Sequence, residues 1–218
     1  VAKDDLYAGF EREIVAEEAQ NLLQIPRKQR AVVRNAIGGN FRVTTDKDLD
    51  TFFALFSRTV RDHGTPAFSK KYFRELLNAF PGNADILTVW QGDQPLSSVL
   101  SYYFRDGVDP YYTGSNPEAR VAGTNDLMYW KLMRHAVDRG CRTFDFGRSK
   151  VGTGPFSFKK NWGFTPRPIR HEYLLIGRRT LPNVNPTNPH YQRAIELWRQ
   201  LPLPVANFLS PFISRNLG

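Results

Sequence analysis

Three short strands separated by two tight turns constrain the fold of this chain most strongly. The strands are expected over 86–90, 96–104 and 111–113, and turn residues occupy 92–95 and 105–107 between them. Gly, Asp and Pro in these turns set the backbone for a reversal, and connections this short join antiparallel neighbours. The sequence therefore predicts an antiparallel meander at the centre of the fold.

Helices and further strands surround this meander. A helix over 126–139 carries a strongly periodic apolar face and ends at Gly140. The other expected elements are a strand over 41–45, helices to 62 and over 69–80, a strand over 142–146 and a strand over 170–176. This order predicts an α/β (α+β) fold, in which a mixed, mostly antiparallel sheet is flanked by helices.

The two ends of the chain differ from the middle. Leu6, Phe10 and Ile14 recur every four residues, so we expect a helix over 4–19. We divide the chain into an N-terminal helical segment or linker, 1–24; one domain, 25–177; and a proline-punctuated helical tail, 178–218. The tail has apolar residues at helical spacing, which favours a helix packed on the body, with a membrane-surface helix as the alternative. These residues are Val205, Phe208, Leu209, Phe212 and Ile213.

Composition narrows the range of functions. The net charge of +9 over 218 residues favours polyanionic partners such as phosphates, nucleic acid or an acidic membrane. A single cysteine excludes an internal disulfide, and the four histidines lack zinc-site spacing, so we expect no metal. No apolar run reaches the length of a membrane span, and no signal peptide is seen, which fits a cytoplasmic protein.

Two basic segments are candidate phosphate-binding sites. In the predicted helix over 26–37, Arg27, Arg30 and Arg34 share one face, suited to phosphates or to a membrane surface, although a solvated face is the alternative. The second segment follows the strand at 143–146. That strand ends on Gly147 and leads into a glycine-rich loop that holds clustered cations suited to a phosphorylated ligand. The cations are Arg148, Lys150, Lys159 and Lys160.

Residues 144–148, Phe-Asp-Phe-Gly-Arg, followed by Phe-Lys-Lys-Asn-Trp-Gly at 158–163, resemble the signature of FemAB-like transferases. The succession of elements over about 20–176 resembles the GNAT acyltransferase fold to which that family belongs. The chain is most similar to FemAB-related proteins associated with exosortase and exopolysaccharide loci. The resemblance implies a transferase that moves an aminoacyl or acyl group to an amine of a cell-envelope or exopolysaccharide precursor.

The resemblance also implies ligands and partners. The donor is expected to be aminoacyl-tRNA or acyl-CoA, with no tightly bound cofactor. FemAB-like proteins carry two GNAT-like units, so an N-terminal unit is expected as a partner of this one. Such an enzyme would act in the cytoplasm, at the inner face of the membrane, with residues 201–218 as a peripheral contact.

Candidate site residues combine this resemblance with side-chain chemistry. Lys159 matches the family's aromatic-Lys position and is expected to stabilise an oxyanion or hold a phosphate. Asp145 is expected to orient a cation or act as a base. Arg148, Lys150, Lys160 and the three arginines of the basic helix are expected to bind substrate, and so is Tyr112, from a tyrosine cluster that otherwise serves sheet packing.

The segment before the periodic helix resembles a GNAT pyrophosphate loop. It places Arg120, Gly123 and Asn125 as donor-binding residues, although Asn125 replaces the usual small residue. This departure leaves a donor other than CoA open. Two other functions compete with the transferase: a non-catalytic module that binds RNA or phosphate, and a membrane-peripheral scaffold.

Overall fold

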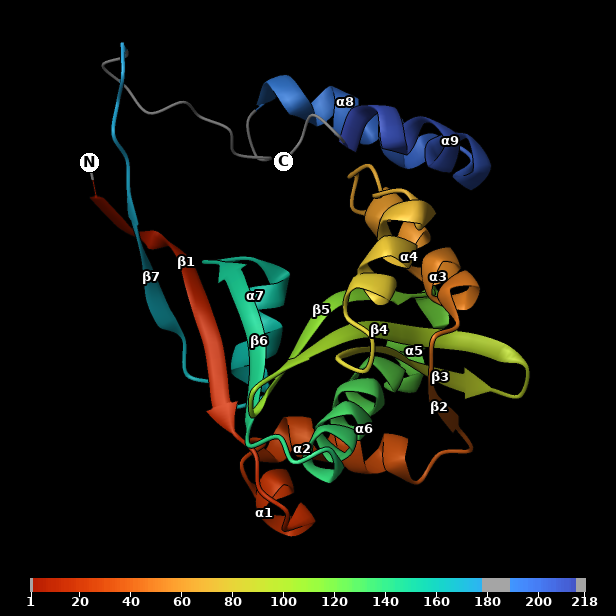
Figure 1. The fold of residues 1–218 in the computed structure, drawn as a ribbon, viewed down its shortest axis with the longest axis vertical. Helices are drawn as coiled ribbons and strands as arrows, with labels where there is room; N and C mark the ends of the chain where they lie inside the picture. Colours follow the sequence, from red (N-terminus) through yellow and green to blue (C-terminus); the bar gives the residue numbers. More distant parts are fainter. Residues whose placement is uncertain (1, 178–188, 215–218) are drawn as a thin grey trace.

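The computed structural model describes residues 2–177 and 189–214, and a seven-stranded sheet forms its centre (Figure 1). The strands lie in the order β2-β3-β4-β5-β6-β1-β7, and only β5 and β6 pair in parallel. The bounds are β1 Ala2–Glu13, β2 Arg42–Asp46, β3 Ala84–Gln91, β4 Gln94–Phe104, β5 Gly107–Ser115, β6 Thr143–Lys150 and β7 Arg167–Glu172. The predicted mixed, mostly antiparallel sheet is confirmed.

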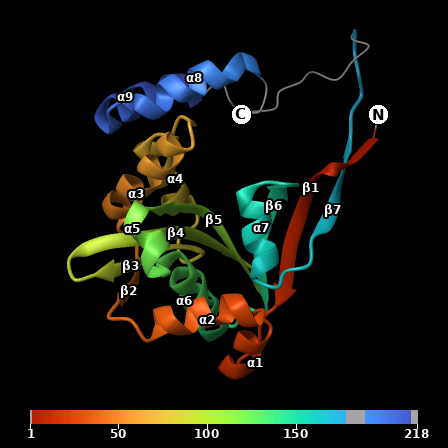
Figure 2. The same ribbon diagram turned by 180° about the vertical axis from the view of Figure 1, so that it is seen from behind.

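Helices cover both faces of this sheet (Figures 1 and 2). Helices α3 and α4 pack on one face, and α2 and α6 on the other, so neighbouring residues such as Ile86 and Leu87 on β3 enter two separate apolar clusters. Alternation along a strand is what makes one strand contribute to both clusters. The bounds are α1 Glu18–Leu23, α2 Arg27–Ile37, α3 Leu49–Asp62, α4 Lys70–Ala79, α5 Pro117–Ala122, α6 Thr124–Asp138, α7 Gly154–Asn161, α8 Pro189–Gln200 and α9 Leu203–Ser214.

Local signals located the middle of the fold correctly. Strands β3, β4 and β5 form the predicted antiparallel meander. The Asp48 side chain accepts from the amide of Thr51 at 3.1 Å and so caps α3, and Ser69 caps α4 in the same way. Each cap satisfies a backbone donor that the first helical turn leaves unpaired.

The expected N-terminal helix is wrong, because residues 2–13 form β1. This strand lies between β6 and β7 and pairs antiparallel with both. A spacing of four residues is consistent with a helix but also with every second inward position of a strand. Ala8 and Phe10 are buried at that strand spacing, and the helix of this segment, α1, spans Glu18–Leu23.

The expected glycine-rich loop after Gly147 is also wrong in part. Strand β6 continues to Lys150, and residues 154–161 form α7. Pro155 occupies the first turn of α7, a position that tolerates a residue without an amide hydrogen. Strand β7 ends at Glu172, earlier than the expected strand over 170–176.

The tail packs on the body, but not through its large apolar residues. Helix α9 buries the small residues Ala206, Ser210 and Ser214, and the amide of Ala67 donates to the Ser210 hydroxyl at 3.0 Å. Phe208 and Phe212 are instead 71 % and 58 % exposed. The predicted packing of the apolar stripe on the body is therefore wrong. Residues 178–188 and 215–218 of the predicted tail lie outside the described residues.

Within the part of the chain that the structure describes, no helix combines the length and the apolar character needed to cross a membrane.

Candidate active site

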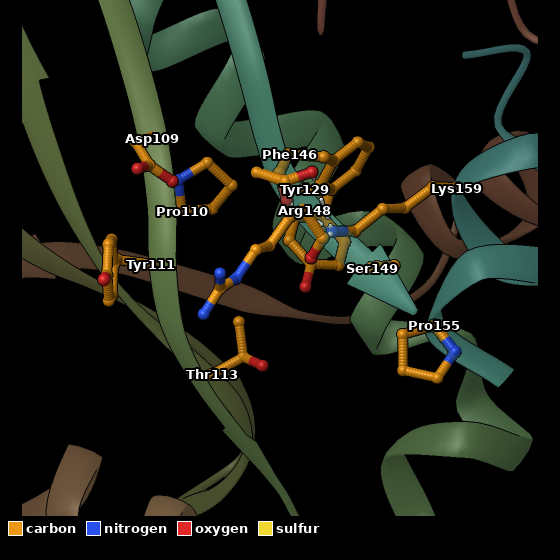
Figure 3. Close-up of a pocket in the computed structure, with 11 residues that line it drawn as sticks. Asp109, Pro110, Tyr111, Thr113, Tyr129, Phe146, Arg148, Ser149, Pro155 and Lys159 are labelled. Carbon is orange, nitrogen blue, oxygen red and sulfur yellow. Dashed lines mark hydrogen bonds between the residues drawn. The ribbon is translucent and has the colours of Figure 1, made fainter. Parts of the chain in front are cut away.

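A fork in the sheet creates a cavity between two of its strands. Strands β5 and β6 pair only at Gly107 with Thr143 and at Val108 with Phe144, and beyond these residues they separate. A cavity of about 360 Å³ opens between them (Figure 3). It is lined by Asp109, Pro110, Tyr111, Thr113, Tyr129, Phe146, Gly147, Arg148, Ser149, Pro155 and Lys159.

A distortion of β6 shapes one wall of this cavity. Gly147 has φ 65°, a conformation that residues with a Cβ rarely adopt. The Asp145 carboxylate accepts from the Gly147 amide at 2.7 Å and so holds the distortion in place. Asp145 is not among the residues that line the cavity, so its bond to the Gly147 amide supports a role in positioning the backbone.

The distorted backbone holds Lys159. The Lys159 amine donates to the carbonyl of Phe146 at 2.5 Å and more weakly to those of Gly147 and Arg148, at 3.4 and 3.3 Å. Burial lowers the pKa of this amine to about 8, against the attraction of Asp145 and Asp109. The amine is therefore anchored by one bond, while the two long bonds leave donors available for a ligand oxygen.

Asp109 is the residue that the sequence analysis missed. It follows Val108, the last residue of β5 that pairs with β6, and lies near Asp145 at the base of the fork. Burial, and to a lesser degree the charge of Asp145, raise the pKa of its carboxyl group to about 6, while the charge of Lys159 opposes the shift. A carboxylate with this pKa, within the same cavity as the Lys159 amine, is suited to accept a proton near neutral pH.

Arg148 and Tyr129 complete the cavity. Figure 3 shows Arg148 extending from the end of β6 and Lys159 from α7 into one space. Arg148 is exposed, and its guanidinium carbon lies 5.1 Å from the centre of the Tyr7 ring. Tyr129 of α6 also lines the cavity. Burial raises the pKa of its hydroxyl to about 12, so the hydroxyl stays neutral.

The remaining predicted cations lie outside the cavity lining. Lys160 is on the exposed side of α7, with its amine 5.8 Å from the Phe156 ring centre, and Lys150 ends β6. Arg30 donates to the backbone carbonyls of Ile25 and Leu23 at 3.0 and 3.1 Å, which gives it a structural role at the start of α2. Arg27 and Arg34 are exposed on α2, so any ligand contact they make is outside this cavity.

The predicted pyrophosphate loop is helical and covered. Residues 117–122 form α5, Gly123 is buried with φ 69°, and Asn125 lies within the first turn of α6 rather than capping it. A Cβ added to Gly123 would lie 3.4 Å from Val32 and 3.6 Å from Ala36, so α2 packs against this turn. The side chain of Arg120 lies outside the described residues.

A buried carboxylate, Asp126, also disfavours a phosphate at the start of α6. Asp126 accepts from the Trp162 indole at 2.7 Å and from the Gln29 amide at 2.5 Å. These bonds satisfy the carboxylate inside the protein, although burial raises its pKa. The residues present therefore do not fit a phosphate at the start of α6.

A second cavity of about 380 Å³ adjoins the first and shares Tyr111 with it. It is mostly aromatic, and Tyr112 lines it, with its hydroxyl 3.0 Å from that of Tyr72. The hydroxyl oxygen of Tyr102 is buried there and has no hydrogen-bond partner. The structure thus places Tyr112 in a cavity, as a substrate-binding residue requires, but separates it from Lys159.

Among the side chains that the structure describes, no group of three His, Cys, Asp or Glu residues is arranged to hold a metal ion. A sheet that forks between two parallel strands, covered by helices on both faces, is the fold of the GNAT class of N-acyltransferases. The family model described as "Acetyltransferase (GNAT) domain" matches residues 22–160, and the chain belongs to this family.

Solved structures agree with this assignment at the level of fold. The chain in the crystal structure of FemX is 18 % identical to this chain, with a TM-score of 0.67. The match covers 73 % of this chain and 59 % of the FemX chain. The C-terminal domain of a protein described as a lysylphosphatidylglycerol synthetase, from Agrobacterium fabrum, is 12 % identical with a TM-score of 0.57. This match covers 78 % of this chain and 60 % of the Agrobacterium chain. The FemAB-like character of the fold is thus confirmed. Among curated proteins, none matches this sequence.

Proposed function

We propose that the cavity between β5 and β6 transfers an aminoacyl or acyl group from a phosphorylated donor to an amine. The observation that carries the proposal is that Asp109 and Lys159 line the same cavity. Burial raises the pKa of the carboxyl group to about 6 and lowers that of the amine to about 8. Between these values Asp109 is a carboxylate and Lys159 is a cation, so both have the charge that acyl transfer requires.

The chemistry follows from these charges. Asp109 removes a proton from the acceptor ammonium, and the neutral amine attacks the carbonyl carbon of the donor ester or thioester. Lys159 stabilises the oxyanion that forms on the carbonyl oxygen. The attack forms the C–N bond. As the C–O or C–S bond of the donor then breaks, the leaving oxygen or sulfur takes a proton from Lys159 or water, and the amide nitrogen passes its second proton to the neutral Lys159 or to water.

The surroundings of the pair support a donor with phosphates and a bulky acceptor. Arg148 provides a cation at the exposed end of the cavity, where it can pair with phosphate oxygens of aminoacyl-tRNA or acyl-CoA. The covered backbone around Gly123 favours a donor that is not bound in the manner of CoA. The aromatic cavity beside Tyr111 has the chemistry to hold a sugar ring or peptide of a cell-envelope or exopolysaccharide precursor.

The proposal extends to the whole protein and its location. This chain spans about 60 % of the length of the FemX and synthetase structures. We infer that a second, N-terminal GNAT-like unit completes the acceptor site, and that the enzyme works in the cytoplasm at the inner face of the membrane.

The test is transfer by the full-length protein with labelled aminoacyl-tRNA or acyl-CoA and precursor amines. The variant Lys159→Met should lose about a hundredfold in turnover, because one oxyanion donor disappears. The matched control Lys131→Met changes an exposed lysine of α6 and should leave turnover unchanged. Equal loss in both variants, or loss in neither, would contradict the role of Lys159.

One observation favours a second function. Arg27 and Arg34 are exposed on one basic helix, which is suited to phosphate backbones without chemistry. Tight RNA binding with a steep salt dependence, but no transfer with any donor, would support a non-catalytic phosphate- or RNA-binding module instead.

A further inference from the structure

Helix α9 presents its large apolar side chains to solvent. Val205, Phe208, Leu209, Phe212 and Ile213 are each 37–71 % exposed and lie on one side of the helix; we call these five residues the α9 apolar face. The side that packs on the body carries Ala206, Ser210 and Ser214. A soluble helix normally places its large apolar residues inward, so this arrangement is the reverse of the usual one.

The orientation of α9 is fixed by specific bonds. Ser210 accepts from the Ala67 amide at 3.0 Å, and the Asn207 side chain donates to the Ser57 hydroxyl at 3.3 Å. Arg61 of α3 donates to the Leu201 carbonyl, just before the helix, at 2.9 Å. Rotating α9 to bury its apolar face would break the first two of these bonds, so the exposed face is a built feature of the fold.

The chemistry of the surroundings indicates what covers this face. Helix α9 has no charged residue over Leu203–Ser214. The two helices beside α9, α4 and α8, carry more exposed cations than exposed carboxylates. The cations are Lys71 and Arg74 on α4 and Arg193 and Arg199 on α8, and the carboxylates are Glu75 and Glu196. Arg199 also donates to the His63 carbonyl at 3.4 Å. Apolar residues that enter the acyl boundary, bordered by cations that meet anionic headgroups, are the features of an interfacial helix.

The shape of the molecule favours a bilayer over a second protein surface. Helices α8 and α9 form one row across an end of the molecule, above α3 and α4, in both views (Figures 1 and 2). A raised row of helices meets a flat surface along its whole length. With 12 residues, α9 is about 18 Å long, which suits lying in the interface and is too short to span a bilayer.

We propose that the α9 apolar face docks on an anionic lipid bilayer. The row of α8 and α9 lies at the end toward which β5 and β6 diverge (Figure 1). A bilayer on this face would therefore lie on the side where the fork of the sheet opens. The proposal does not depend on the transfer reaction, because it concerns only the attachment of the protein to lipid.

Vesicle flotation of the full-length protein tests the proposal. Vesicles of phosphatidylcholine with about one third phosphatidylglycerol should carry the wild type upward, and pure phosphatidylcholine should carry less. The double variant Phe208→Ser/Phe212→Ser should lower the partition coefficient at least tenfold, because two exposed rings no longer enter the bilayer. The control Leu23→Ser removes a 62 % exposed residue of α1 at the far end and should change nothing.

Three outcomes would overturn the proposal. The wild type fails to float, or the double variant floats as well as the wild type, or sedimentation shows that the double variant turns a dimer into a monomer while neither binds vesicles. The last outcome would mean that a second copy covers the α9 apolar face. Because the substituted side chains are exposed, far-ultraviolet circular dichroism and the melting temperature should not change, which separates loss of docking from loss of folding.

Discussion

Replacing Asp109 with Asn should make the protein more stable while it makes the enzyme inactive. Burial beside Asp145 raises the pKa of the Asp109 carboxyl group from 3.8 to about 6. The folded state therefore holds this proton more tightly than the unfolded state, and stability falls as pH rises through this interval. At pH 8, well above both values, the charged form costs up to about 3 kcal/mol.

An amide at this position has no charge to bury, so the variant should regain part of that cost. Asn fits the same space, and the expected gain at pH 8 is about 1–3 kcal/mol in the free energy of unfolding. Near pH 5 the gain should fall to about half, because the native carboxyl group is then largely protonated. Urea unfolding at both pH values measures the difference, and turnover measured in parallel should fall at least a hundredfold.

The control for this experiment is Asp93→Asn, which changes an exposed aspartate in the turn between β3 and β4. It should alter neither stability nor turnover. A loss of stability in Asp109→Asn at pH 8 would refute the reasoning, because it would show that the Asp109 charge is compensated within the fold. Full turnover in the stabilised variant would remove Asp109 from the mechanism.

Three further predictions follow from the same geometry. The rate should depend on pH in a bell shape, rising as Asp109 loses its proton near pH 6 and falling as Lys159 loses its proton near pH 8. An active Lys159→Arg variant should keep its rate to higher pH. If the rate of that variant still falls near pH 8, Lys159 is not the source of the fall. Gly114→Ala should cost at least about 3 kcal/mol by urea unfolding, because its Cβ would collide with the α3 backbone at Leu55 and Phe56. The control Gly38→Ala adds a Cβ that meets its nearest neighbours at 3.7 Å, so it should cost less, and equal costs would contradict this packing. Trp162→Phe should cost about 1–3 kcal/mol by the same assay, because Asp126 loses its 2.7 Å bond to the indole; an unchanged midpoint would mean that water replaces the bond.

The middle of the fold could be predicted because its signals are local. The turns of the meander and the side-chain caps of α3 and α4 act over three or four residues. The strand β1 could not be distinguished from a helix, because Leu6, Phe10 and Ile14 fit both periods. Its place between β6 and β7 depends on pairing across more than a hundred residues.

Only the part of the site that lies in a short sequence motif could be predicted. The Asp145 and Lys159 motif identified one wall of the cavity, and Arg148 joined it because it follows in the same strand. Asp109 was missed because its strand was expected to begin at 111, whereas β5 begins at Gly107. Its significance arises from the register of β5 on β6, which sets two carboxyl groups side by side and which no short motif records.

The basic helix shows the opposite failure. The spacing of Arg27, Arg30 and Arg34 suits phosphates. Arg30, however, donates its hydrogen bonds to the backbone carbonyls of Ile25 and Leu23. A charged face indicates what a helix can bind, and only the fold shows which cations remain available. The same reasoning applies to α9, where helical spacing was correct and the direction of the face was not.

Hydrogen–deuterium exchange of the full-length protein tests most directly whether the fork of the sheet holds the donor. Peptides covering residues 146–161 should exchange more slowly when the donor that supports transfer is added, because that donor would seal the cavity formed by β6 and α7. Protection confined to α2, with unchanged exchange over 146–161 during active transfer, would show that the donor binds elsewhere.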